Sequence, residues 1–567
     1  MKKYLSIIAA LAVSVSSFAQ GFNPVVEVTN TFEGKLMEVN KQNLEMSVPD
    51  SLLRFDWDFD YSTFENPYKG AYDFTPYAMN IAPEKEGYTG RNLYLRAGAG
   101  YSFHPELNAV WSPKLNGRFQ MSVYDDLKGY SGSYHCFKYN YQGSRYDLSE
   151  GDPVAGSDYS NRMGVNAMVD GRNLIMVFDA GWDAIRAMYD RVGNDYNSLD
   201  ASIGLRSAGR SRTSFELDAK ILRGWEKAYG HVLPETLLKL GGVLGRKTDI
   251  PGLAAGVSFG SESAWWTEDF GSGKAGFVYA EPQLSRTWER ASAKLGLKLA
   301  LPYNTAHKGT IVYPQFYADY MLSPESLKLF ASLTGGPRLD SFHSTIRSYH
   351  FVPSDFAFLY SDYLGDVTID AYDARIGMTG RVNTRLQYTL SAGVERHANM
   401  LAASFAGYHY GPSLVEYHTD GRVRLDFGRT DVLVKHADLE AAWTSDRFDL
   451  DAAVTLRDTQ VKDSFRMILP SALSGSLNAR YNWNRRIYAG VSLQAASGRT
   501  GQLSDDYLGS CMTLPGWVDL GLSGEYELSR RLTVWAKGCN LLGHRVQRNL
   551  LYVEKGPYFT AGICLSL

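Results

Sequence analysis

The sequence predicts an all-β protein, namely a transmembrane antiparallel β-barrel of about 22 strands, within an accepted range of 16 to 24. Three observations carry this prediction. Long segments alternate strictly between apolar and polar residues. No apolar run after the first twenty residues is long enough for a membrane helix. Short and long turns alternate between these segments.

The first twenty residues have the layout of a secretory signal peptide. Lys2 and Lys3 precede an apolar run from Tyr4 to about Val15, and small residues lead to a cleavage site near Ala19. An uncleaved anchor helix is the alternative, but the run is shorter than the roughly 17 to 25 residues that a spanning helix needs. We therefore assign residues 1–20 to a signal peptide and expect the mature protein to leave the cytoplasm.

Composition separates the remaining classes of exported protein. The stretch 173–182, which is the most apolar later segment, is interrupted by Asp179, so a helical membrane protein is excluded. With 37 Tyr, 26 Phe, 11 Trp and 54 Gly, the chain suits the aromatic girdles and packed strands of a barrel better than a soluble exported domain. The formal net charge of −3 gives no indication of a nucleic-acid partner.

The last residues, KGPYFTAGICLSL, end the chain inside an alternating segment. Because an unpaired strand end would expose its backbone groups, this strand must be paired on both sides. We expect it to pair with its predecessor and with the first strand, near Leu93 to Tyr101, which closes the barrel. Phe559 would lie near the outer interface and Leu567 near the periplasmic one. The predicted C-terminal membrane-insertion strand presents these residues to lipid: Phe559, Ala561, Ile563, Leu565 and Leu567.

The opposite phase of several segments is polar. In RFDLDAAVTLR and RIYAGVSLQAA, alternate residues are apolar while those between them are charged or polar. Successive side chains of a strand point to opposite faces, so these segments need one apolar and one polar environment. The residues that we predict to face the lumen are Asp449, Asp451, Arg457, Gln494, Asp519, Glu525 and Lys537.

Turn lengths give the strand count. Short turns at 444–447, 482–486 and 528–531 alternate with longer connections around 458–471 and 497–516. Short periplasmic turns and long external loops are typical of an outer-membrane barrel. Turn centres repeat every 39 to 45 residues or so, and the region from Asn92 onward therefore holds about eleven hairpins. We divide the chain into the signal peptide 1–20, an N-terminal periplasmic or lumenal segment 21–88, and a barrel 89–567.

The C-terminal pattern resembles a known family. WAKGCNLLGHRVQ, followed by a loop and a last strand containing Phe559, is similar to the end of TonB-dependent receptor barrels, although Leu567 replaces their usual terminal aromatic residue. The resemblance implies a barrel of this size in the outer membrane of a Gram-negative-type envelope. It also implies a plug domain, and the segment 21–88 is too short for one. We therefore expect a receptor-like barrel without a full plug.

Candidate chemistry is weak. Asp56, Asp58 and Asp60 alternate as in a calcium loop, but Tyr61 and Pro67 occupy positions where that loop has Gly and Glu. His409, Glu416 and His418 are metal-binding residue types without a metal-site spacing. No nucleophile elbow or other hydrolase signature is present. The sequence therefore predicts no enzyme, no cofactor, no catalytic residue and no metal site.

Two functions remain open at this stage. The first is solute or nutrient passage across the outer membrane by a receptor-like barrel, without assurance of active coupling, because the plug is expected to be incomplete. The second is a non-catalytic accessory or structural subunit of a larger outer-membrane assembly. The expected partners are outer-membrane lipid, the machinery that inserts barrels and, for the second function, other envelope proteins.

Overall fold

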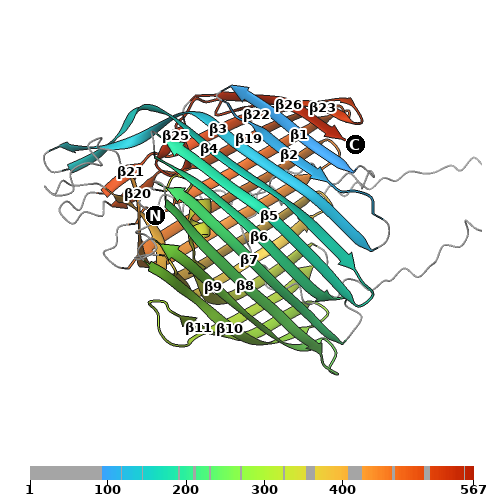
Figure 1. Ribbon diagram of the computed structural model, residues 1–567. Helices are drawn as coiled ribbons and strands as arrows, with labels where there is room; N and C mark the ends of the chain where they lie inside the picture. Colours follow the sequence, from blue (N-terminus) through green and yellow to red (C-terminus); the bar gives the residue numbers. More distant parts are fainter. Residues whose placement is uncertain are drawn as a thin grey trace, which may run out of the picture. The chain divides into compact units, whose positions relative to one another are not determined.

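The computed structural model describes residues 92–567 except 102, 116–117, 143–144, 190–191, 209–211, 229–230, 269–270, 324–325, 353–363, 407–423, 463–466, 503–510 and 555. Figure 1 shows these residues from the side, as long tilted strands that form the wall of a barrel. The predicted signal peptide 1–20, the segment 21–88 with its three aspartates, and the His409 to His418 stretch lie outside the described residues.

Twenty-two antiparallel strands form the wall. In chain order they are β1 (Leu93–Tyr101), β2 (Glu106–Trp111), β3 (Phe119–Gln142), β4 (Arg145–Asp170), β5 (Leu174–Tyr189), β6 (Val192–Ser207), β7 (Thr213–Ala228), β8 (His231–Lys247), β9 (Leu253–Glu268), β10 (Gly271–Thr287), β11 (Ala291–Tyr303), β12 (Ile311–Ser323), β13 (Leu327–Asp340), β14 (Asp366–Val382), β15 (Leu386–Ala406), β16 (Arg424–Thr444), β17 (Phe448–Val461), β18 (Leu473–Trp483), β19 (Ile487–Ala496), β22 (Trp517–Ser529), β23 (Leu532–Cys539) and β26 (Tyr558–Ser566).

Four further strands and one helix lie in the connections at one end of the barrel. They are α2 (Phe342–Ser348), β20 (Arg499–Gln502), β21 (Cys511–Leu514), β24 (Val546–Asn549) and β25 (Tyr552–Glu554). β20 and β21 pair only with each other as a separate sheet, and β25 adds to β3. No helix among the described residues is long and apolar enough to cross a membrane.

The barrel is closed, as the sequence predicts. Each wall strand pairs with its neighbours along the chain, and β26 pairs with both β23 and β1. The β1–β26 register runs from Tyr94 opposite Ser566 to Tyr101 opposite Phe559, and Leu567 exchanges backbone hydrogen bonds of 2.9 and 2.8 Å with Leu93. The predicted first and last strands and the count of about 22 are confirmed.

Close approach at this seam depends on glycine. Gly98 lies opposite Gly562, and a Cβ on Gly562 would come 2.0 Å from the Ala97 carbonyl oxygen. The Trp535 indole covers Gly98, where an added Cβ would meet its ring at 2.4 Å. The Arg96 guanidinium stacks on the same indole, 4.3 Å from its ring centroid. Gly98 therefore makes room for the buried tryptophan, and Gly562 allows the close approach of the β1 backbone.

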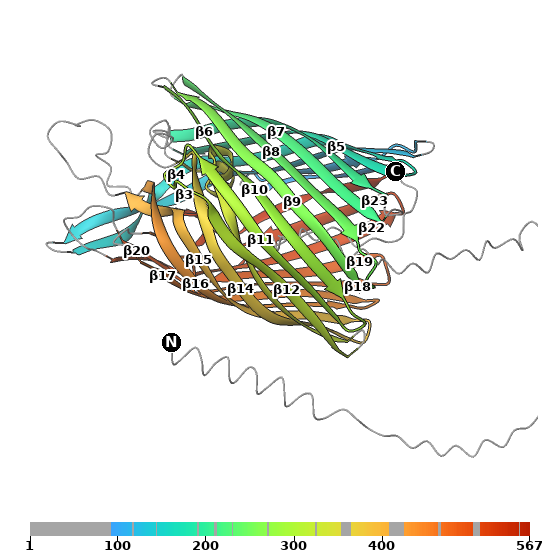
Figure 2. The ribbon, with the colours of Figure 1, turned by 90° about the horizontal axis from the view of Figure 1, so that it is seen from below.

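In the second half of the chain, the turns at one end of the barrel are short and those at the other end are long. The end that carries Leu567 has the short turns 171–173, 383–385, 445–447, 484–486 and 530–531, and the other end has the long connections 341–365, 497–516 and 540–557. The alternation predicted from the second half of the chain is therefore confirmed there, whereas in the first half the external connections after β3, β5, β7 and β9 have only two residues each. Figure 2 shows β3, β4 and β20 extending past the rest of the wall at the long-loop end. We call this end the external mouth.

Burial alternates along the strands because one face of the wall is apolar. On β6, Leu199 and Ile203 are exposed, whereas Ser198 and Asp200, the two neighbours of Leu199, are buried. The same alternation places Leu295, Leu297, Leu299 and Leu301 of β11 on the exposed face. Such a band of large apolar side chains on the outside matches hydrocarbon, and the inner face is left to polar groups.

Lipid contact on the last strand can be tested with a single charge. Ile563 is exposed on β26, and an arginine at the bilayer midplane costs about 2 to 4 kcal/mol. We expect Ile563→Arg to abolish stable insertion, measured by heat-modifiable mobility of the membrane fraction after urea extraction. Gln494→Arg, which places the same charge on the polar phase of β19, should insert normally. An Ile563→Arg protein that remained heat-modifiable would contradict the lipid-facing position of this residue.

Candidate functional site

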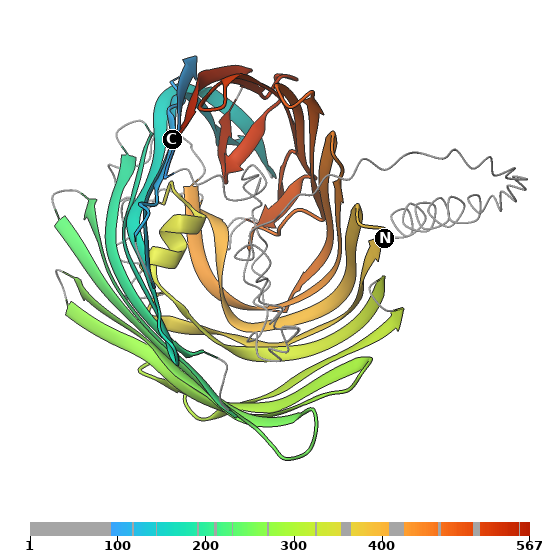
Figure 3. The same cartoon turned by 90° about the vertical axis from the view of Figure 1, so that its right-hand side faces the viewer.

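A hydrophobic core closes over the external mouth. It contains side chains from four separate connections, including Phe342 and Ile346 of α2, Ile468, Leu514 of β21 and Leu551. These pack against wall residues near the ends of β3, β5, β6, β15 and β16. Figure 3 shows α2 inside the ring of strands. The mouth is therefore occupied by the protein's own loops, among the residues that the structure describes.

Helix α2 is too short to be stable alone, and its ends are held by other elements. A seven-residue helix lies well below the roughly 12 to 15 residues at which isolated helices become even marginal. Ser341 and Ser344 form a reciprocal capping box at its start. The buried Glu235 carboxylate of β8 accepts the backbone N–H groups of Phe342 and His343, each at 3.0 Å. An anion at the helix N-terminus satisfies donors that the helix itself cannot.

Two side chains of α2, those of Arg347 and His343, contact the wall. The Arg347 guanidinium lies 3.0 Å from the buried Asp183 carboxylate of β5. His343 Nδ1 lies 2.8 Å from the Tyr196 hydroxyl of β6. Burial, with a further contribution from Arg347, lowers the pKa of His343 to about 4. The imidazole is therefore neutral near pH 7, and its hydrogen bond with the Tyr196 hydroxyl joins two uncharged groups.

The residues after α2 continue along the inner wall. The Asn194 amide of β6 donates to the carbonyl oxygens of His350 at 2.7 Å and Val352 at 3.1 Å. His350 Nδ1 lies 2.8 Å from Asp158 of β4. Phe351 stacks on Tyr552 with 4.1 Å between ring centroids. The stacking ties the loop after β13 to the loop before β26.

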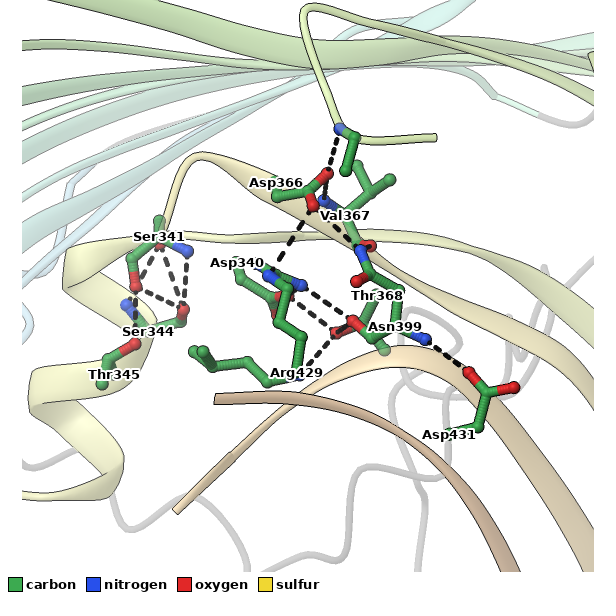
Figure 4. Close-up of polar contacts among 12 residues, drawn as sticks. Asp340, Ser341, Ser344, Thr345, Asp366, Val367, Thr368, Asn399, Arg429 and Asp431 are labelled. Carbon is green, nitrogen blue, oxygen red and sulfur yellow. Dashed lines mark hydrogen bonds and ion pairs between the residues drawn. The ribbon is translucent and has the colours of Figure 1, made fainter. Parts of the chain in front are cut away.

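The base of the 341–365 connection is clamped by a buried ion network (Figure 4). Asp340 ends β13 and Asp366 begins β14, so the two carboxylates flank the connection. Arg429 of β16 donates to Asp340 Oδ2 at 2.9 Å, and its Nε lies 3.7 Å from Asp366 Oδ2. The Thr368 hydroxyl donates to Asp340 Oδ2 at 2.7 Å.

Asn399 completes the clamp from β15. Its side-chain amide nitrogen donates to Asp366 Oδ2 and to the Val367 carbonyl, each at 2.9 Å. The backbone carbonyl of Asn399 accepts from Arg429 at 2.8 Å. Asn399 has a positive φ of 54°, at a point where the β15–β16 register shifts. Asparagine tolerates this left-handed conformation better than most residues. The irregular backbone therefore turns the Asn399 amide toward the clamp.

The last external connection is held by Asp519, one of the predicted lumen residues. Asp519 Oδ1 accepts the Asn540 backbone N–H at 2.7 Å, and its other oxygen pairs with Arg548 of β24. Arg548 also pairs with Glu554 of β25. Burial raises the pKa of Glu554, and Arg548 opposes that shift. One guanidinium thus bridges two carboxylates beneath this loop.

Other predicted lumen residues join ion pairs on the wall. Glu525 accepts from both Arg96 and Arg480 at 2.9 Å, and Lys537 pairs with Glu106. Gln494 lies opposite Asp519 in the β19–β22 register. The others occupy β17, where Asp449 lies opposite Arg480, Asp451 opposite Asn478, and Arg457 opposite His436 of β16. That these residues line a passage remains a prediction.

Sequence reasoning missed the residues that build the mouth. It predicted no element within 341–365, and neither Glu235 nor Arg429 was a candidate. The one local signal is the Ser341–Ser344 pair, which fits the start of a helix. Glu235 and Arg429 lie on other strands, about 106 and 88 residues away from Ser341. No spacing in the sequence can reveal such contacts.

Solved structures share this architecture. The siderophore receptor PirA from Acinetobacter baumannii matches with a TM-score of 0.59 and 10% identity over 84% of this chain and 80% of that chain. Its fold is that of the TonB-dependent receptor barrel. The receptor-like barrel also matches the ferric enterobactin receptor PfeA from Pseudomonas aeruginosa, with a TM-score of 0.59 and 12% identity over 84% and 81%.

A third match is the ferric-catecholate import receptor Fiu from K12 E. coli, with a TM-score of 0.55 and 10% identity over 84% of this chain and 82% of that chain. No family model matches the sequence, and no curated protein matches it. The predicted resemblance and outer-membrane localisation are confirmed at the level of the fold. The expectation of an incomplete plug concerns residues outside the described part of the chain.

The clamp predicts a local loss of stability on removal of its cation. Arg429→Met leaves Asp340 and Asp366 buried without their guanidinium, and breaking a buried pair in this way costs about 3 to 5 kcal/mol. We expect faster hydrogen exchange at the Gly365 amide, which donates to the Asp340 carbonyl at 3.1 Å. Arg212→Met, which breaks the exposed pair with Asp249, is the matched control and should change nothing.

Acid should loosen α2. The pKa of His343 is about 4 in the docked state, below its ordinary 6.5, so the docked state loses stability as pH falls from about 6.5 through 4. The facing cations Arg347, Lys220 and Arg162 act in the same direction, and Asp200 opposes them. Exchange of the α2 amides, corrected for intrinsic rates, should rise across this window. The uncharged amide of His343→Gln can hydrogen-bond to Tyr196 at every pH, so the rise in exchange at low pH should disappear in that variant. A rise as large as that of the native protein would contradict the assignment.

Proposed function

We propose that the protein passes a solute across the outer membrane through its lumen, and that the segment 341–352 forms the external gate. The observation that carries the proposal is the mode of closure. α2 is held to the wall by Glu235, by the Arg347–Asp183 pair and by the His343–Tyr196 hydrogen bond, with no covalent link among the described residues. Such contacts can be exchanged for water.

The width of the barrel supports passage. Small barrels fill their interior with side chains, whereas barrels of 16 strands or more leave a lumen that must be plugged or remain open. The ion pairs of Glu525 with Arg96 and Arg480 lie along the wall rather than across a packed core. A solute that crosses would be polar, because charged groups of both signs line its route. The proposed function involves no catalysis and no cofactor.

Energy coupling rests on residues outside the described part of the chain. We propose that residues 21–88 form a periplasmic or lumenal segment, which is shorter than the plug of the receptor family. A barrel with such a segment suits solute passage without assured active coupling. Insertion would use the outer-membrane assembly machinery, for which the alternating β26 is the expected recognition strand.

An accessory role in a larger outer-membrane assembly is the second candidate. The observation that favours it is the length of β3 and β4, which have 24 and 26 residues. A tilted membrane crossing takes about 9 to 11 residues, so this hairpin projects far past the bilayer. Figure 2 shows the projection at the external mouth. An extended hairpin of this kind can dock another envelope protein.

Single-channel recording separates the two functions. We expect a variant in which residues 342–352 are replaced by a short Gly-Ser linker to conduct several-fold more current in planar bilayers than the native barrel, because the gate is removed. Proteoliposomes with this variant should also swell faster in small polar solutes.

The matched control changes exposed residues of another external loop. Thr305→Ala with His307→Ala alters only the connection between β11 and β12. It should conduct as the native barrel does. Two results together would favour the accessory role over transport. The linker variant would conduct no current, and other envelope proteins would co-purify stoichiometrically with the native barrel but not after the β3–β4 hairpin is shortened.

A further inference from the structure

Imidazole and carboxylate groups converge on the inner face of β14, β15 and β16, away from the gate. One potential ligand atom each from Asp373, Glu395 and His436 lies within 4.8 Å of the other two. Ile376, Leu390 and Leu439 of the same strands are exposed on the opposite, apolar face. Asp373 lies directly opposite Glu395 in the β14–β15 register. The backbone therefore places the two carboxylates side by side.

His436 is buried and oriented like a metal ligand. Its Nδ1 lies 2.5 Å from Asp438 Oδ2, so the Nδ1–H group donates a hydrogen bond to the carboxylate. Its Nε2 is buried without a hydrogen-bond partner and lies 3.3 Å from Glu395 Oε1. Metal-binding histidines characteristically donate one ring nitrogen to a carboxylate, which fixes the tautomer and leaves the other lone pair free. The side chain of His436 is 5% exposed.

A glycine makes the space for this imidazole. Gly393 lies opposite His436 in the β15–β16 register. A Cβ at Gly393 would come 2.4 Å from His436 Nε2, which is closer than the ring could tolerate. The missing side chain lets the ring lie flat over β15 and reach toward Glu395, two residues further along the strand. The approach is thus built into the backbone.

A second histidine repeats the arrangement on the other side of Glu395. His397 Nδ1 lies 2.7 Å from Asp370 Oδ1, and its Nε2 lies 3.3 Å from Glu395 Oε2. Both imidazoles are therefore backed by a carboxylate, and both direct Nε2 at the same glutamate. His436 faces Glu395 Oε1, and His397 faces Glu395 Oε2.

Local charge also favours a cation. The cluster holds four carboxylates, those of Asp370, Asp373, Glu395 and Asp438. The Arg375 guanidinium contacts two of them, at 2.8 Å from Asp373 Oδ1 and 2.6 Å from Glu395 Oε1. Arg375 thus contacts one oxygen of Asp373 and one of Glu395, and the second oxygen of Glu395 faces His397 Nε2. Arg375 offsets one of the four negative charges, and His397 and His436 offset others only when they are protonated.

We propose that Asp373, Glu395 and His436 bind a divalent transition-metal ion of the zinc class on the lumen wall. Imidazole nitrogen with carboxylate oxygen is a donor set that suits Zn²⁺ and its neighbours rather than Ca²⁺ or Mg²⁺, which prefer oxygen alone. Partial exposure of Glu395 and Asp373 gives the ion access from the lumen. The site stands independently of solute passage, because it requires only the folded wall.

Zinc titration of the purified protein tests the proposal. The full chain, carrying a Strep tag rather than a polyhistidine tag, is stripped with chelator in detergent and titrated with ZnCl₂ by calorimetry. We expect one site that His436→Ala abolishes and that Asp438→Asn weakens about 10- to 100-fold, the usual effect of losing a carboxylate behind a ligating histidine. Co²⁺ should give visible d–d bands in the native protein and none in His436→Ala.

Three further variants separate a metal site from a structural ion network. Arg375→Met should tighten Zn²⁺ binding because it removes the competing cation, and Gly393→Ala should weaken it by displacing His436. His307→Ala, on an exposed loop, is the matched control and should bind as the native protein does. Heat-modifiable mobility confirms that each variant is folded.

Absence of a site in the folded native protein, or binding that persists in His436→Ala, would overturn the proposal. Weaker binding in Arg375→Met would also overturn it, because a purely structural network loses stability with its arginine. A native barrel that conducts solute but binds no zinc rejects this site and leaves the proposed function intact.

Discussion

Closure of the strand ladder is the constraint on which the rest of the structure depends. In hydrocarbon, an unpaired backbone N–H or C=O costs several kcal/mol, so a sheet can cross a membrane only when it has no edge. The pairing of β26 with β1 removes the last edge, and it brings the two ends of the wall together at Gly98 and Gly562. Once the ring is closed, lipid demands an apolar outer face.

Polar chemistry is then confined to the inner face and the mouth. Because alternate residues point inward, each strand supplies charged groups to the lumen without disturbing its lipid contact. The wall pairs its charges along the surface, as Glu525 does with two arginines. The largest hydrophobic core of the described residues forms at the external mouth, where long connections meet. The barrel thus has its apolar packing at its rim.

Irregularities in three neighbouring strands position both groups of buried polar residues. The β14–β15 register shifts between Asp370 and Tyr372, and the β15–β16 register shifts between His397 and Met400. Bulges re-aim side chains and are common beside functional sites. Here the shifts lie between the clamp formed by Arg429 with Asn399 and the cluster around Glu395. The same strands can therefore serve the gate above and the proposed ion site below.

The sequence by itself determined the class of the fold and most of the wall. Alternation along KGPYFTAGICLSL and its counterparts depends only on the side-chain period of a strand, so the closed barrel, its count of about 22 and the short turns near 445, 484 and 530 could be predicted. These features are local, and lipid enforces them uniformly along the chain.

Only the tertiary structure decided what lies at the mouth and on the inner wall. α2 forms because Glu235 of a distant strand accepts its first N–H groups, and a seven-residue helix has no sequence signature strong enough to predict it. Asp373, Glu395 and His436 meet because consecutive strands lie side by side in a particular register. Register is a property of the assembled sheet, and no short spacing in the sequence encodes which inward residues become neighbours across it.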